Sequence, residues 1–163
     1  MTDGPRSEPG TVVGVRMTEG LEQVEYELML LIRRSRQRTA QMSAQIHPSL
    51  DIAGYLILVA IKEGHDHDPL GVRATDIADS FGVHKSTISR ALGQLEEFGL
   101  VTRVPDEEDG RARRIHLTSA AEHGLALVAE QRRVRLAAVL SPWRPEDLRS
   151  LAQSLAHLNT DMG

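Results

Sequence analysis

Three arginines stand directly after a cluster of acids in the second half of the chain. They are Arg111, Arg113 and Arg114, within the stretch PDEEDGRARRIHLT that covers residues 105–118. Guanidinium groups form strong hydrogen bonds with phosphate and carboxylate oxygens, and an arginine can enter a narrow DNA minor groove, where the negative potential is strongest. The neighbouring carboxylates can orient these arginines. The stretch therefore favours arginines held in defined positions over a generic basic patch.

A second group of polar side chains shares one face of a predicted helix. At about 100° per residue, Leu92 and Leu95 fall within about 40° of Ile88 and form its apolar face. The other side of the helix is polar, with Lys85 near its start, followed by Ser86, Thr87, Ser89, Arg90 and Gln94. Small hydroxyl groups can approach base edges, and Arg90 can make a bidentate contact with guanine, so this face suits a DNA major groove.

A third candidate is the stretch HDHD at residues 65–68. Imidazole and carboxylate groups suit zinc, manganese or iron, but alternating residues in a loop beside Pro and Gly are more often plain surface. We therefore predict no metal site and no bound cofactor. No nucleophile with a base and an orienting partner is visible either, so the sequence does not predict an enzyme.

Composition limits the classes of protein that the chain can represent. It has 163 residues, 40% of them hydrophobic, a net charge of −4 and no cysteine, which excludes thiol redox sensing and disulfide scaffolds. No apolar run approaches the ~20 residues that a membrane span requires, so we expect a cytoplasmic protein without membrane contact. Since the net charge is negative, any DNA binding has to depend on where the cations are placed.

The elements that would position these side chains form a helix-turn-helix followed by a hairpin. A short helix carrying Ile77 and Phe81 breaks at Gly82, and the second, polar-faced helix follows. The stretches GLVTRVP and RRIHLT then flank the polar turn DEEDGRA and predict a β-hairpin, or wing. Before these elements, GHDHDPLG interrupts a strongly apolar helix and predicts a surface loop. The predicted fold is mainly α with a small β-hairpin wing.

Apolar residues recur at helical spacing toward both ends of the chain. Residues 1–17 show no period and predict a flexible arm or an extended segment, whereas residues 18–47 predict a helix with Leu21, Val24 and Leu28 on one face. Residues 119–163 predict two more helices, the last of which carries Leu148, Leu151, Leu155 and Leu158. Since a winged domain over residues 48–118 is complete without these faces, they predict a homodimer. Packing inside one larger domain is the alternative.

Three stretches follow a known pattern in order and spacing: STISRALGQLEEFGLVTR, the triplet DGR at residues 109–111, and IHLT. In these residues the chain resembles the multiple-antibiotic-resistance regulator (MarR) family of winged helix-turn-helix transcription factors. The resemblance implies an obligate dimer with intertwined terminal helices, whose wings grip a pseudo-palindromic operator in double-stranded DNA. It implies that Arg111 is a minor-groove arginine with Asp109 as its structural partner. It also implies major-groove contacts by Ser86, Thr87 and Arg90.

Two functions are therefore expected. The leading one is a dimeric, sequence-specific DNA-binding transcriptional regulator, a repressor that a small-molecule effector relieves, as the resemblance implies. The residues assigned to DNA binding are Lys85, Ser86, Thr87, Ser89, Arg90, Gln94, Asp109, Arg111, Arg113 and Arg114. The alternative is a winged-helix module that binds protein, which the net charge and the acids Glu96 and Glu97 favour. Salt dependence of binding to random duplex DNA separates the two.

Overall fold

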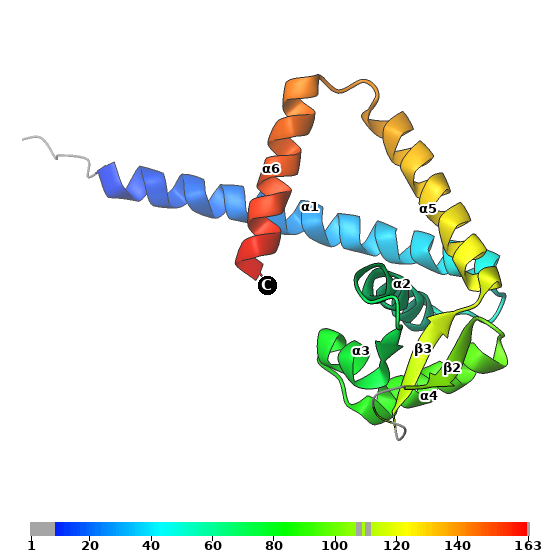
Figure 1. Cartoon of the computed structure of the whole chain (residues 1–163). Coiled ribbons are helices and arrows are strands. Elements are labelled where there is room, and N and C mark those ends of the chain that lie inside the picture. Colours follow the sequence, from blue (N-terminus) through cyan, green and yellow to red (C-terminus); the bar gives the residue numbers. More distant parts are fainter. Residues whose placement is uncertain (1–8, 107–108, 110–111, 163) are drawn as a thin grey trace, which may run out of the picture. The chain divides into compact units, whose positions relative to one another are not determined.

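The computed structural model describes residues 9–106, 109 and 112–162, with side chains from residue 20 onward. The chain divides into two compact units, residues 1–53 and residues 54–163, and each is described by itself. The first unit contains one long helix and the turn after it. The second contains a winged helix-turn-helix and two C-terminal helices (Figure 1).

Helix α1 runs from Pro9 to Ile46. It begins before the predicted start at residue 18, so the end of the predicted flexible arm is helical. Proline fits at this position because the first backbone N–H groups of a helix have no acceptor within it, so the missing N–H of proline costs no hydrogen bond, and its fixed φ already suits the helix. The helix ends at Ile46, one residue before the predicted end at residue 47. A turn follows in which the Leu50 N–H donates to the His47 carbonyl at 2.9 Å.

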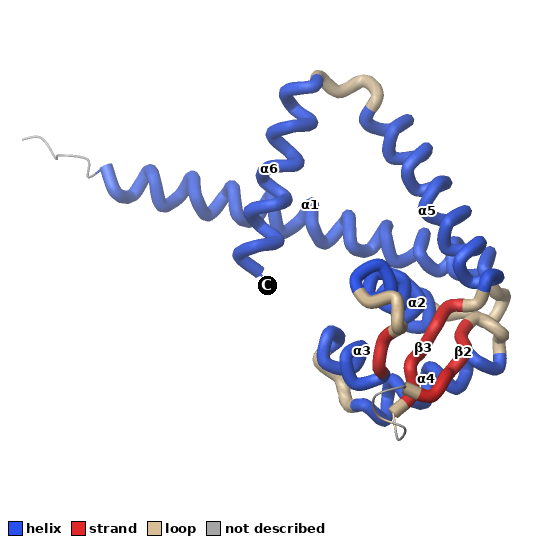
Figure 2. The backbone as a smooth tube through the Cα atoms, in the orientation of Figure 1, coloured by secondary structure: helices blue, strands red, loops and turns tan. Residues whose placement is uncertain are grey.

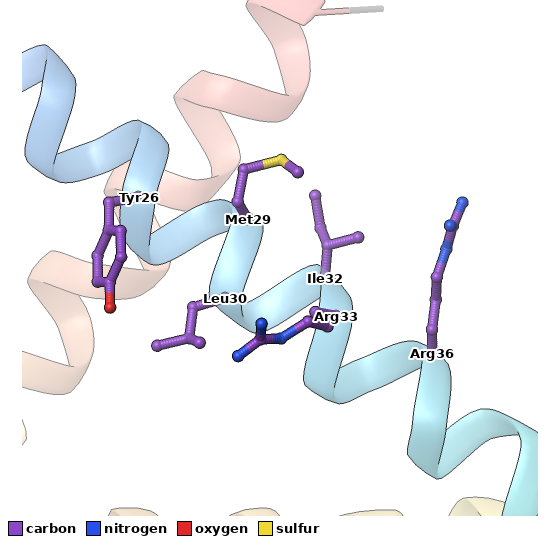
Figure 3. Close-up of a pocket in the computed structure, with 6 residues that line it drawn as sticks. All are labelled: Tyr26, Met29, Leu30, Ile32, Arg33 and Arg36. Atoms are coloured by element: carbon purple, nitrogen blue, oxygen red, sulfur yellow. The ribbon is translucent and has the colours of Figure 1, made fainter.

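The apolar side chains of α1 are largely exposed. Figure 3 shows four of them beside two arginines, with Tyr26, Leu30 and Arg33 on one side of the helix and Met29, Ile32 and Arg36 on another. Leu21 is 67% exposed and Tyr26 63% exposed. A single chain therefore leaves much of the apolar surface of α1 in contact with water.

The second unit contains a small sheet and helices of different lengths. After α2 (Ile52–His67) come β1 (Val72–Arg73), α3 (Ala74–Phe81), α4 (Lys85–Glu97), β2 (Val101–Pro105), β3 (Arg113–Leu117), α5 (Ser119–Leu140) and α6 (Pro145–Met162). The strands form an antiparallel sheet in the order β1-β3-β2 (Figure 2). The predicted fold class is confirmed, and β1 is an addition because two residues are too few to show an alternating pattern.

Each strand and helix of the wing region is fixed by its neighbours. Val101 pairs with Leu117 and Pro105 with Arg113 in the β2–β3 hairpin, while Val72 of β1 pairs with Ile115. Helix α4 packs on β2, and α3 packs on α4 and on the sheet. The core beneath them is formed by buried side chains from every layer, among them Leu58, Ile61, Ile77, Ile88, Leu92, Leu95, Val101, Ile115 and Val128.

The predicted surface loop GHDHDPLG is partly wrong, because α2 continues through His67. The Asp68 N–H still donates to the Gly64 carbonyl at 2.8 Å. A Cβ at Gly64 would overlap Cγ1 of Val72, so the glycine lets α2 pass close to β1. Tertiary packing here outweighs the low helix propensity of glycine, which a sequence pattern weighs more heavily.

Candidate nucleic-acid interface

The turn between α3 and α4 depends on a left-handed glycine. Gly82 has φ 61° and ψ 34°, a conformation that residues with a Cβ adopt at a penalty. The Val83 N–H donates back to the Ala78 carbonyl at 3.0 Å and closes the end of α3. His84 then caps α4 by its backbone carbonyl, which accepts from the Thr87 N–H at 2.9 Å, and its side chain makes no cap hydrogen bond. These contacts begin α4 at Lys85.

Helix α4 has the two faces that its sequence predicts. Ile88, Leu92 and Leu95 are buried against the core. The polar residues of the predicted contact face lie at the surface, with Ser89 intermediate and the others exposed: Lys85, Ser86, Thr87, Arg90 and Gln94. Their hydroxyl, amide and guanidinium groups therefore stand where a nucleic acid could reach them.

One residue of the wing contacts this helix. Arg103 of β2 places its Nε 3.1 Å from Glu96 Oε2, and its Nη2 makes a long hydrogen bond of 3.5 Å to the Ser89 carbonyl. A Cβ at Gly93 would stand 3.9 Å from the same Nη2. The arginine thus connects the first wing strand to α4, a role that the sequence analysis did not assign.

The three wing arginines do not form one group. Arg113 is exposed at the start of β3, opposite Pro105. Arg111 lies outside the described residues, so its predicted position remains a prediction. Arg114 is turned inward, with only 12% of its side chain exposed. Alternation along a strand sends neighbouring side chains to opposite faces, and this signal could have separated Arg113 from Arg114 in the sequence.

Arg114 is held by three acceptors. Its Nε donates to Asp106 Oδ2 at 2.7 Å, and its Nη1 donates to Asp68 Oδ2 at 2.9 Å and to the Gly71 carbonyl at 2.8 Å. Burial works to lower the pKa of Arg114, but the hydrogen bonds to Asp106 and Asp68 and their negative charges raise it above its ordinary value. Its guanidinium is therefore a fixed cation whose donors face protein acceptors.

The acid at the centre of the wing base is Asp106, which the sequence analysis did not single out. It is 3% exposed and sits one residue after β2. Its Oδ2 accepts from Arg73 Nε at 2.8 Å as well as from Arg114. Its Oδ1 accepts from the Asp109 N–H at 3.3 Å, which places the predicted orienting acid Asp109 in the same turn. Asp109 itself is exposed.

The histidine and aspartate stretch at the end of α2 contributes to this packing. Besides the bond between Asp68 and Arg114, the rings of His65 and His116 meet edge to face with centroids 5.7 Å apart. Among the described residues, no three His, Asp or Glu side chains are arranged to hold a metal ion. None of the described helices is long and apolar enough to cross a membrane.

Comparison with known proteins identifies similar sequences. Residues 50–112 match the MarR family, a range that contains α3, α4 and β2. An uncharacterized HTH-type transcriptional regulator, YxaD of Bacillus subtilis (strain 168), is 28% identical over 139 residues, which cover 85% of this chain and 92% of that protein. Both similarities are to transcription regulators.

Solved structures share the fold. The MarR family transcription regulator SP03579 superposes with a TM-score of 0.75 at 20% identity, over 91% of this chain and 93% of the other. FabT of Streptococcus pneumoniae, in a crystal structure with DNA, has a TM-score of 0.72 at 16% identity, over 87% and 96% of the two chains. At these identities the superpositions establish the winged helix-turn-helix architecture.

Proposed function

We propose that the chain, which matches the MarR family over residues 50–112, acts as a homodimeric, sequence-specific regulator that binds double-stranded DNA through α4 and the wing. The observation that carries the proposal is the division of α4 into a buried apolar face and an exposed face of hydroxyl, amide and cationic side chains. A neighbour with the same fold, FabT, was crystallised with DNA.

In this proposal α4 reads bases in the major groove. Arg90 makes a bidentate contact with guanine, while Ser86 and Thr87 approach base edges or phosphates near the start of the helix. Lys85 contacts phosphate, and Ser89 and Gln94 flank the reading face. Ser89 is partly covered and its carbonyl accepts from Arg103, so its side chain has the least room for a base contact.

The wing supplies the second contact. Arg113 is exposed and can reach the DNA backbone. Arg111 is assigned to the minor groove with Asp109 as its partner, as the resemblance to the MarR family implies. Arg114 has a different part, because its donors already face Asp106, Asp68 and Gly71. We assign it to holding the wing in place.

A second copy of the chain covers the terminal helices. Leu21, Leu31 and Leu151 are 67%, 59% and 38% exposed in one chain, and such apolar faces on long helices are most simply buried against their own copies. Two winged domains in a symmetric dimer would read a pseudo-palindromic operator. We further propose that the protein represses transcription in the cytoplasm and that a small-molecule effector relieves this repression, as the resemblance to the MarR family implies.

The test is selection of bound sequences from a random duplex library with the purified protein. We expect a pseudo-palindrome whose affinity falls steeply with salt, because phosphate contacts release counterions. If the protein binds no duplex DNA even at low salt, the alternative function is favoured, a winged-helix module that binds another protein. The net charge of −4 is consistent with that alternative.

A further inference from the structure

We propose that Asp106 is a positioning residue that ties the wing to the helix-turn-helix and so sets the register between the minor-groove and major-groove contacts. This inference rests on the proposed DNA binding. Asp106 does not face DNA in this account, since only 3% of the residue is exposed. It acts through the two arginines that it holds.

The contacts of Asp106 span elements far apart in the sequence. Its Oδ2 accepts from Arg73 Nε at 2.8 Å and from Arg114 Nε at 2.7 Å, and a second Arg73 nitrogen, Nη2, lies 2.7 Å away. Arg114 continues to Asp68 at 2.9 Å. The two carboxylates of Asp68 and Asp106 and the two guanidinium groups of Arg73 and Arg114 therefore form one cluster with equal numbers of negative and positive charges. We call this cluster the Asp106 clamp.

Arg73 connects the clamp to the helix-turn-helix. It directly precedes α3, and its backbone N–H donates to Asp76 Oδ2 in the first turn of that helix at 3.2 Å. Helix α3 packs on α4, which carries the base-reading face. The contacts therefore run from the wing turn through Arg73 to α3 and then to α4.

The wing needs such a connection at this point. Strand β1 pairs only with Arg114 and Ile115 of β3, so the last pair of the β2–β3 hairpin, Pro105 with Arg113, has no third strand beside it. A hairpin of two strands alone is only marginally stable in water. The Asp106 N–H donates to the Ala112 carbonyl at 3.2 Å, and its Oδ1 holds the Asp109 N–H, so the same residue closes both sides of the turn. A change in the position of Asp106 would therefore also change the position of Arg113, the exposed wing arginine assigned to DNA.

A mutant cycle on the full-length protein tests this role. The probe is the duplex selected from the random library, compared with a random duplex at fixed salt. We expect Asp106→Asn to lower the ratio of operator to random affinity by about tenfold, the size of one lost base preference. Asp66→Asn is the control, because it removes the same charge from a side chain that is 63% exposed and pairs with Lys62 at 3.6 Å.

The cycle adds Arg113→Ala and Arg90→Ala to each background. In the wild-type background both should weaken operator binding, by about tenfold for the base-reading arginine. In the Asp106→Asn background the effect of Arg113→Ala should nearly vanish, while the effect of Arg90→Ala should persist, because only the wing has lost its position. A general loss of folding would reduce both effects together.

Three results would overturn the inference. Equal effects of Arg113→Ala in both backgrounds would show that the wing does not depend on Asp106. If Asp106→Asn does not fold, Arg73→Gln repeats the cycle, since it keeps the pair of Asp106 and Arg114, and an unchanged cycle there would also reject the clamp. Wild-type protein that binds no duplex would reject the proposed function as well, and with it any positioning role.

Discussion

The winged region and the terminal helices differ in how much of their apolar surface is buried within one chain. In the winged region Ile88, Leu92 and Ile115 are at most 3% exposed, and the partly covered charges are paired. On α1 and α6 the leucines Leu21 and Leu151 remain 67% and 38% exposed. The first region is complete within one chain, and the second is completed by a partner in our proposal.

The contrast assigns the two regions different tasks. A region with a closed core and a balanced ion cluster can hold side chains in fixed positions, which base recognition requires. Long helices with exposed apolar faces can instead bring two such regions together at a set spacing. Mutations should therefore separate assembly from DNA contact.

The largest effect is expected from Leu151→Asp. It places a charge in an apolar face that the dimer would bury, so the dimer should dissociate or the chain should aggregate. Sedimentation at low micromolar concentration measures this. Leu70→Asp is the control, because Leu70 is 55% exposed in a loop of the winged unit and should leave a dimer. A wild-type chain that sediments as a folded monomer would contradict the proposed role of α1 and α6.

Arg114→Ala should come next, acting on stability. It removes one guanidinium from buried Asp106, and breaking a buried pair from one side lowers the free energy of unfolding by about 3 kcal/mol. Arg73 still holds Asp106, which keeps the loss at the low end of that class. Denaturant unfolding measures it, and Arg113→Ala, at the exposed neighbour, should unfold like the wild type. Equal stability of the two variants would mean that Arg114 is not structural.

The fold was largely readable from the sequence, because local patterns determine it. The 3.6-residue period of α4, the glycine at the α3–α4 turn and the alternation of β3 are properties of short segments. The Asp106 clamp was not readable, since it joins Asp68, Arg73 and Arg114 across distant segments and depends on their packing. The end of α2 was not readable for the same reason, because the close approach of Val72 in β1 to Gly64 is a tertiary contact that the local pattern does not show.

Arg90→Ala should weaken operator binding by about 1–3 kcal/mol and relax the preference at one base position in each half-site. The reason is that a bidentate contact with guanine has no substitute on the exposed face of α4. Lys85→Ala should weaken all sequences alike. Affinities for operator and random duplex measure the difference. Equal losses on both duplexes for Arg90→Ala would assign this arginine to phosphate.

Arg113→Ala should act on the salt dependence. If Arg113 contacts one phosphate, the slope of log affinity against log salt should fall in magnitude by about 0.9 per protomer. Stability should not change, because the side chain is exposed. Titration of binding at several salt concentrations gives the slope, and an unchanged slope would leave Arg113 as a solvated residue.

Arg111→Ala should lower the affinity for DNA more strongly when the flanks of the binding site are A·T-rich, because the minor groove is narrow there.

The smallest effect is expected from acid on the bond between Asp68 and Arg114. The Leu70 N–H, which donates to Asp68 Oδ1 at 3.0 Å, is the main cause that keeps the pKa of Asp68 below its ordinary value, and Arg114 adds to it. A carboxyl whose pKa is lowered by folding stabilises the protein above its unfolded pKa and loses that contribution as pH falls through the folded value. Asp68→Asn should therefore be less stable than the wild type near neutral pH, and the difference should shrink between about pH 5 and pH 2. Denaturant unfolding at a series of pH values measures this, provided that both proteins unfold in two states.

Parallel stability curves over that range would show that the bond contributes nothing to the wing base, and Arg114 would then depend on Asp106 and the Gly71 carbonyl.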